Sequence, residues 1–222
     1  MKSILKKNLT IYTSHCDSSA KMGIPNALSI FMDLATEHAN ELGVGSDKLS
    51  KKGLIWVASK TKAVFYNRPY MMQTVEISTW PEKPERIRFN RHYKIKSNNE
   101  LLIAGKTEWA VIDKESGRPQ KAEGIYPTEL EYCDEQPIAE AFSKIDTDFE
   151  NAQLLGSYKV ISTDIDLYGH MNNVAYVRAI MGMFSSKELQ EMQIKSFEIN
   201  YRIPCFEGEI LNVYKRNLDN GI

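Results

Sequence analysis

Apolar residues recur at helical spacing in two separate stretches of the chain. Within residues 26–42 the apolar stripe steps by three and four and comprises Leu28, Phe31, Ala35, His38 and Leu42. Within residues 172–184 the same spacing joins Val174, Val177, Met181 and Phe184. Steps of three and four place side chains on one face of an α-helix. The pattern therefore predicts two amphipathic helices, of which the first ends at Gly43.

The segments around these helices predict an internal duplication. A strand is expected before each helix, at residues 10–17 and 158–166, with an asparagine, Asn26 or Asn173, as the N-cap. Asp17 and Lys21 are spaced like Asp166 and His170. After each helix come a strand, a proline and another strand, so that Pro69 is aligned with Pro204, and Thr74 with Glu209. We call the two repeats the first and second copy.

The first copy continues with two more predicted strands, residues 88–97 and 101–113, around an Asn-Asn-Glu turn. The second copy ends at Leu-Asp-Asn-Gly-Ile, and is therefore expected to be short of its last two strands, through truncation or an incomplete sequence. We predict an N-terminal domain (1–118), an acidic surface linker (119–157) with a short helix at 138–144, and a C-terminal domain (158–222). The predicted class is α+β, a tandem hot-dog with each curved antiparallel sheet wrapped around a long helix; another two-layer sandwich is the alternative.

The composition is that of an ordinary globular protein, with 42% hydrophobic residues, 26% charged residues and a formal charge of -1. It does not favour nucleic-acid binding. The first ten residues lack a secretory signal pattern, and no apolar stretch approaches the length of a membrane span. Three widely separated cysteines favour neither a disulfide framework nor a zinc site. A cytoplasmic location is expected.

Chemistry is concentrated in residues 164–173, Asp-Ile-Asp-Leu-Tyr-Gly-His-Met-Asn-Asn. One interpretation is a polar turn in which Asp166 and the asparagines cap a helix. The other is catalytic: Asp166 orients the His170 imidazole for proton transfer, and the free amides of the following helix stabilise an oxyanion. The first copy has Lys21 where the second has His170, as expected if one copy is reactive and the other shapes a pocket.

The segment 164–177 resembles the DxDxNxHxNNxxY stretch of the acyl-acyl carrier protein thioesterases. Residues 54–81, 108–121 and 199–205 are similar to further segments of that family. The resemblance implies hydrolysis of a fatty acyl thioester on acyl carrier protein, without a metal or diffusible cofactor. The sequence leaves the oligomeric state open, with a homodimer as the candidate. The resemblance assigns catalytic positions to Asp166, His170, Asn172, Asn173 and Cys205.

Two positions depart from the family pattern. Tyr168 replaces an asparagine, and Pro204 replaces the glutamate before the cysteine, for which Glu207 is a candidate substitute. The hypothesis is that His170 activates a water. Cys205 is either a small buried residue or a covalent nucleophile. The alternatives to a carrier-protein thioesterase are an acyl-CoA thioesterase and a non-catalytic module that binds acyl thioesters.

Two further sites are predicted from the first copy. Phe31, Met32 and Leu34 either line an acyl pocket or form ordinary core, and His38 is expected to be a core residue with a hydrogen-bond partner. An acidic carrier protein would dock on positive charge, and the candidates are Arg86, Arg88, Arg91, Lys94 and Lys96. A solvated sheet face explains the same run of charge.

Overall fold

The computed structural model describes residues 3–216. The described residues form two compact units, one of residues 3–142 with 194–200 and the other of residues 143–193 with 201–216. The predicted boundaries at 118 and 157 remain a prediction. In the part of the chain described, no helix has the length and apolar character needed to cross a membrane.

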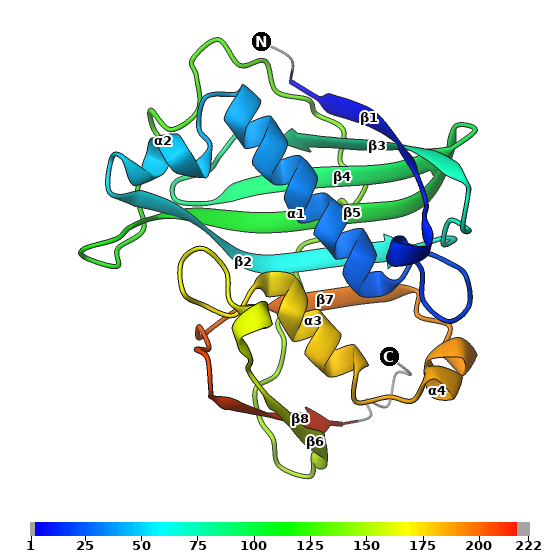
Figure 1. Ribbon diagram of the computed structural model, residues 1–222. Coiled ribbons are helices and arrows are strands. Elements are labelled where there is room, and N and C mark those ends of the chain that lie inside the picture. Colours follow the sequence, from blue (N-terminus) through cyan, green and yellow to red (C-terminus); the bar gives the residue numbers. More distant parts are fainter. Residues whose placement is uncertain (1–2, 217–222) are drawn as a thin grey trace. The chain divides into compact units, whose positions relative to one another are not determined.

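The first unit is a six-stranded antiparallel sheet with a long helix across it (Figure 1). The strand order is β1-β3-β4-β5-β2-β7. The strands are β1 (Leu5–Thr10), β2 (Leu54–Phe65), β3 (Thr74–Pro81), β4 (Phe89–Ser97), β5 (Glu100–Asp113) and β7 (Ser196–Asn200). The helices are η1 (Thr13–His15), α1 (Ile24–Glu41) and α2 (Ser46–Ser50). A long helix on a curved antiparallel sheet is the hot-dog arrangement predicted from the sequence.

Helix α1 buries the apolar stripe predicted for it. Phe31 is fully buried, and its ring stacks on Tyr93 with centroids 4.5 Å apart. Gly105 of β5 lies directly beneath, where a Cβ would come within 2.3 Å of the Phe31 ring. His38 is also fully buried and contacts Arg91 through Nδ1 at 3.0 Å, which confirms it as a core residue with a partner.

The start of α1 differs from the prediction. The N-cap is Gly23, and Pro25 lies in the first turn, where its missing N–H costs no helical hydrogen bond. Asn26 is inside the helix, and its side chain donates to the carbonyl of Ser14 at 2.9 Å. The strand expected at 10–17 is also wrong: β1 ends at Thr10, and η1 follows.

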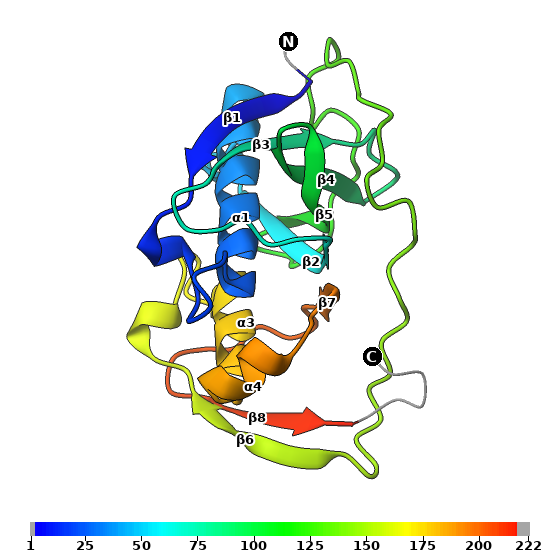
Figure 2. The same cartoon turned by 90° about the vertical axis from the view of Figure 1, so that its right-hand side faces the viewer.

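The acidic linker covers the sheet face opposite α1 (Figure 2). No helix forms at 138–144, so that prediction is wrong. The segment instead runs extended and buries Leu130 and Ile138. The Glu135 carboxylate accepts a hydrogen bond from Lys94 Nζ at 2.6 Å, and the Glu135 carbonyl accepts one from the Trp80 indole at 3.0 Å. Residues 119–142 of the linker therefore form part of the first unit's packing, so the solvated connection expected here is wrong for this part, whereas residues 143–157 belong to the second unit.

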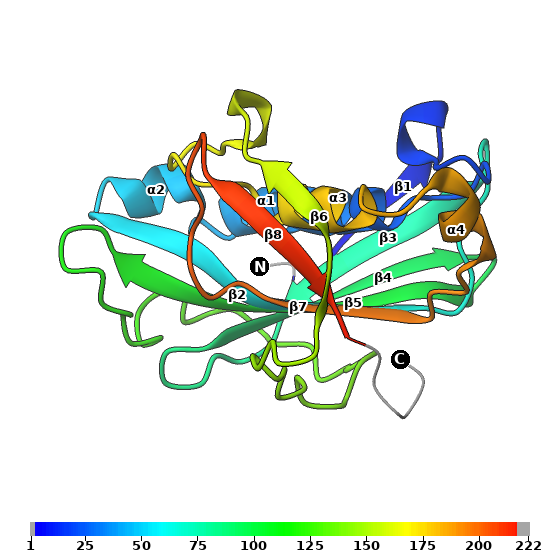
Figure 3. The same cartoon turned by 90° about the horizontal axis from the view of Figure 1, so that it is seen from below.

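The second unit pairs β6 (Gln153–Lys159) with β8 (Ile210–Lys215) as an antiparallel ribbon (Figure 3). Its helices are η2 (Ser162–Asp164), α3 (Asn173–Met181) and α4 (Ser186–Glu191). A buried cluster of Val160, Met171, Ala175 and Ala179 forms its core. The strand expected to run to residue 166 ends at Lys159. The predicted stop of the second copy at 218–222 lies outside the described residues.

The duplication is confirmed by hydrogen bonds that recur in each copy. Asp17 N–H donates to the carbonyl of Lys21 at 2.9 Å, and Asp166 N–H donates to that of His170 at 2.8 Å. Later in the copies the register differs by one residue from the sequence alignment. Met22 N–H donates to the carbonyl of Pro69, and the equivalent bond runs from Met171 to Cys205. Position 69 thus corresponds to 205, and not to 204.

Likewise, Ile11 N–H donates to the carbonyl of Gln73, and Val160 N–H to that of Glu209. The correct equivalents are therefore Arg68 with Pro204, Tyr70 with Phe206, and Gln73 with Glu209. The proline in each copy suggested the wrong register because two unrelated prolines lie one residue apart in the aligned turns.

Candidate active site

The loop between β6 and α3 is held from beneath by Asp164. This side chain is 5% exposed and accepts hydrogen bonds from the Tyr158 hydroxyl at 2.7 Å and the Ile161 amide at 3.1 Å. The Asp164 carbonyl accepts the Asn172 N–H at 2.8 Å, which joins the start of the loop to its end. The hydrogen bond to Asp164, together with burial, raises the pKa of Tyr158, so this hydroxyl remains a donor.

Asp166 organises the main chain of the loop. Its Oδ1 accepts the backbone N–H of Tyr168 at 2.8 Å and that of His170 at 3.2 Å. Gly169, at φ +80°, takes the left-handed conformation that closes the turn. The hydrogen bond predicted between the Asp166 carboxylate and the His170 imidazole is not made: the carboxylate contacts the amide of that residue, and not its ring.

The imidazole of His170 is partly exposed and lies against an aromatic ring. Its centroid is 5.2 Å from that of Phe206, and the two ring planes are inclined at 73°. Edge-to-face pairs at this distance are favourable. Within residues 3–216, Phe206 is the only side chain with which the imidazole forms a ring contact. Neither ring nitrogen forms a hydrogen bond there, so both are available to a ligand.

Helix α3 begins three residues after His170. Asn172 is the N-cap, not Asn173 as predicted, and its Oδ1 accepts the Val174 N–H at 2.8 Å. The Asn172 carbonyl accepts the Ala175 N–H at 2.8 Å. Among the first three amides of the helix, the described structure leaves only the Asn173 N–H without a partner. The positive end of the helix dipole therefore presents one free donor, where the sequence suggested several.

Cys205 contacts the loop through its main chain. Its carbonyl accepts the Met171 N–H at 2.8 Å, and its N–H donates to the Tyr176 hydroxyl at 3.0 Å. Burial and a hydrogen bond with the Cys205 side chain raise the pKa of Tyr176, which keeps this hydroxyl neutral. The cysteine is partly buried against the core of the second unit.

The two positions that depart from the family pattern are both in this region. Tyr168 is partly buried, and Pro204 is exposed. Glu207 is exposed in the turn between Phe206 and Glu209. The glutamate that makes a contact here is Glu209, whose carboxylate accepts the Phe206 N–H at 2.8 Å.

Sequence reasoning missed Phe206, Tyr176 and Asp164. The signal for Phe206 was its equivalence to Tyr70, which the one-residue register error concealed. Asp164 and Tyr176 are the first and last positions of the motif in residues 164–176, but neither was assigned a role from the sequence.

The first copy has the same loop with a different charge arrangement. Burial favours the neutral form of Asp17, but hydrogen bonds from Ser19 and Arg68 outweigh it and lower the pKa of Asp17. Lys21 Nζ lies 5.7 Å from the centroid of the Tyr70 ring, in the position that His170 takes against Phe206. Because Pro204 replaces Arg68, Asp166 lacks the guanidinium that Asp17 binds.

Half of the eight predicted pocket and docking residues are buried. Phe31 and Leu34 are buried, and Met32 is partly buried. The docking prediction is wrong for two members, because Arg91 is buried against His38 and Thr79 while Lys94 is covered by Glu135. Arg86 and Arg88 are exposed, and Lys96 is partly buried.

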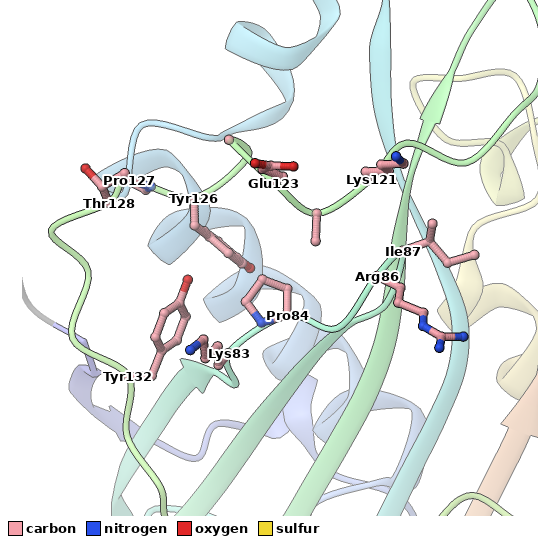
Figure 4. A pocket seen from close by; sticks show the side chains of 12 residues that line it. Lys83, Pro84, Arg86, Ile87, Lys121, Glu123, Tyr126, Pro127, Thr128 and Tyr132 are labelled. Carbon is pink, nitrogen blue, oxygen red and sulfur yellow. The ribbon is translucent and has the colours of Figure 1, made fainter.

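A cavity of about 580 Å³ lies elsewhere in the first unit (Figure 4). Its lining residues include Tyr126, Tyr132, Lys83, Arg86 and Lys121, with the two tyrosines on the same side (Figure 4). None of the predicted catalytic residues lines it. In the described part of the chain, no group of three or more His, Cys, Asp or Glu side chains is arranged to hold a metal ion.

Comparison with known proteins matches almost the whole chain to one family. Residues 2–126 match the acyl-ACP thioesterase N-terminal domain, and residues 147–221 match the acyl-ACP thioesterase C-terminal domain. The curated oleoyl-acyl carrier protein thioesterase of Coriandrum sativum, a chloroplastic protein, is 22% identical over 203 residues. That alignment covers 83% of this chain and 54% of the relative, so the chain spans about half the length of this relative.

Two solved structures share the fold. An acyl-ACP thioesterase from Bacteroides thetaiotaomicron superposes with a TM-score of 0.84 at 22% identity, covering 95% of this chain and 85% of that one. The 12:0-ACP thioesterase from Umbellularia californica gives 0.82 at 16% identity, with coverages of 100% and 90%.

Proposed function

The chain belongs to the acyl-ACP thioesterase family, and from this premise we propose that it hydrolyses the thioester between a fatty acyl chain and the phosphopantetheine arm of acyl carrier protein. The products are a free fatty acid and the carrier protein with its thiol restored. The observation that supports this most directly is the partly exposed imidazole of His170, on a loop that leads into a helix N-terminus.

In the proposed mechanism His170 is the general base. A ring nitrogen takes a proton from water as the water oxygen attacks the thioester carbonyl carbon. The carbonyl oxygen becomes an oxyanion, which the free N–H of Asn173 and the positive end of α3 stabilise. The intermediate then collapses, the carbon–sulfur bond breaks, and the imidazolium returns the proton to the departing thiolate.

The other predicted residues support this machinery. Asp166 fixes the backbone of the loop, and Asn172 caps α3 so that its first amide points away from the helix. Cys205, in the segment between β7 and β8, contributes main-chain hydrogen bonds that join this segment to Met171 of the loop and to Tyr176 of α3. A covalent role for the Cys205 thiol is not part of the proposal.

The proposal also covers the compartment, the partner and the oligomeric state of the protein. Cys16, Cys133 and Cys205 are free thiols, which suits a reducing compartment such as the cytoplasm. An acidic carrier protein is the proposed partner, and a homodimer is the proposed oligomer.

The test of the function is turnover by the purified protein on matched substrates. Acyl carrier protein loaded with saturated chains of increasing length is compared with acyl-CoA of the same lengths, and fatty acid release is measured. The proposal predicts a higher kcat/KM on the carrier-linked substrates. Equal or higher values on acyl-CoA would identify a CoA thioesterase, and binding without release would identify a non-catalytic module.

A further inference from the structure

We propose that Phe206 is the positioning residue of the candidate active site and holds the His170 imidazole in its reactive orientation. This inference rests on the proposed function, because it concerns the same base. A general base must keep one nitrogen aimed at its water, and a small misplacement lowers the rate steeply. Some group must therefore fix the rotation of this ring.

The carboxylate expected to do so is engaged elsewhere. Oδ1 of Asp166 accepts the amides of Tyr168 and His170, which fixes the backbone of the loop and not the imidazole. Within residues 3–216 no side chain is hydrogen-bonded to a ring nitrogen of His170. The aromatic contact with Phe206, at 5.2 Å and 73°, is what restrains the ring.

Phe206 is itself held by two hydrogen bonds, and Cys205 before it by two more. Its N–H donates to the Glu209 carboxylate at 2.8 Å, and its carbonyl accepts the Glu209 N–H at 3.2 Å. The preceding residue, Cys205, is fixed on one side by Tyr176 of α3 and on the other by Met171, the neighbour of His170. Gly208, at φ +88°, allows the tight turn that brings Glu209 back.

The first copy shows that this turn is built to present an aromatic ring. Tyr70 N–H donates to the Gln73 side chain at 3.0 Å, as Phe206 N–H does to Glu209. Met72 has φ +68° at the position of Gly208. The Tyr70 ring then contacts Lys21, the residue equivalent to His170. The same turn therefore places an aromatic ring against Lys21 in the first copy and against His170 in the second.

The experiment compares Phe206→Leu, Phe206→Tyr and the matched control Tyr70→Leu, which removes the equivalent ring from the first copy. Phe206 is 47% exposed and Tyr70 is 51% exposed, so the variants make similar demands on folding. For each we measure kcat and KM, and the NMR signal of the imidazole Cε1–H of His170, assigned by its loss in His170→Ala.

We expect Phe206→Leu to lower kcat about 10-fold with KM within about 2-fold, and to shift the His170 signal by removing the ring current. Phe206→Tyr restores both, and Tyr70→Leu changes neither. An unmoved signal with parental kcat in Phe206→Leu overturns the inference, as does an equal loss of kcat in Tyr70→Leu. Parental turnover in His170→Ala overturns the role of His170 as general base, and no fatty acid release by the parental protein overturns the proposed function. In both cases the NMR comparison still reports whether Phe206 orients the ring.

Discussion

The carboxylate of Asp166 accepts the backbone N–H of His170 at 3.2 Å and leaves its imidazole to other contacts. Asparagine has the same acceptor oxygen at Oδ1, whereas alanine has none. We therefore expect Asp166→Asn to keep kcat within about 3-fold and Asp166→Ala to lower it about 10-fold or more. Steady-state kinetics of the two variants checks this. A loss in Asp166→Asn as large as that in Asp166→Ala would mean that the negative charge itself is required.

Replacing Cys205 tests whether catalysis needs its thiol or only its main-chain hydrogen bonds. Since its two loop contacts use the carbonyl and the N–H, Cys205→Ala should keep kcat within about 5-fold. Mass spectrometry after rapid quenching should find no acyl group on the chain. A trapped acyl-enzyme that disappears in Cys205→Ala would establish covalent catalysis.

The close approach of Gly105 to Phe31 gives a stability prediction. A Cβ at position 105 would lie 2.3 Å from the Phe31 ring, so Gly105→Ala should lower the free energy of unfolding by about 2 kcal/mol. Urea unfolding measures this. Adding Phe31→Leu removes the ring with which the new methyl group clashes. The double variant should therefore lose less free energy of unfolding than the sum of the two single losses. Strict additivity would show that the two positions do not interact.

Glu82 gives a prediction about acid stability. Burial raises its pKa, but hydrogen bonds from His92 and Asn90 and the charge of Lys106 outweigh burial and lower the pKa of Glu82 to about 2. A depressed folded-state pKa contributes stability above the unfolded value of about 4.3, which is lost as the pH falls towards 2.

Between pH 5 and 2 we expect Glu82 to account for a loss of about 2 to 3 kcal/mol in the free energy of unfolding. Glu82→Gln should be less stable at pH 7 and depend less on pH across this range. Parallel curves for the two proteins would contradict this account of Glu82.

The sequence predicted the parts of the fold that depend on local periodicity. The stripe containing Leu28 and Phe31 is buried, and the hairpin at Asn98 and Asn99, both at positive φ, joins β4 to β5 as expected. It failed where distant contacts decide. No helix forms at 138–144, where Ile138 is buried and Lys60 and Lys106 lie over the Phe142 ring. The local sequence pattern does not show these contacts with distant residues.

For the candidate site, the motif predicted that Asp166, His170 and Asn172 share one loop, which the structure shows, but it did not predict the contacts within that loop. The pairing of Asp166 with the His170 ring was inferred from spacing, yet four residues of spacing fit the backbone contact equally well. Phe206 lies 36 positions after His170, and only the hydrogen bonds shared with the first copy reveal its relation to Tyr70.

The central claim is that His170 activates water for thioester hydrolysis, and single-turnover release of fatty acid from acyl-loaded carrier protein tests it most directly. His170→Ala should slow release about 100-fold or more, while Lys21→Ala, the equivalent change in the first copy, should leave it within about 2-fold. Release at the parental rate by correctly folded His170→Ala would contradict the account.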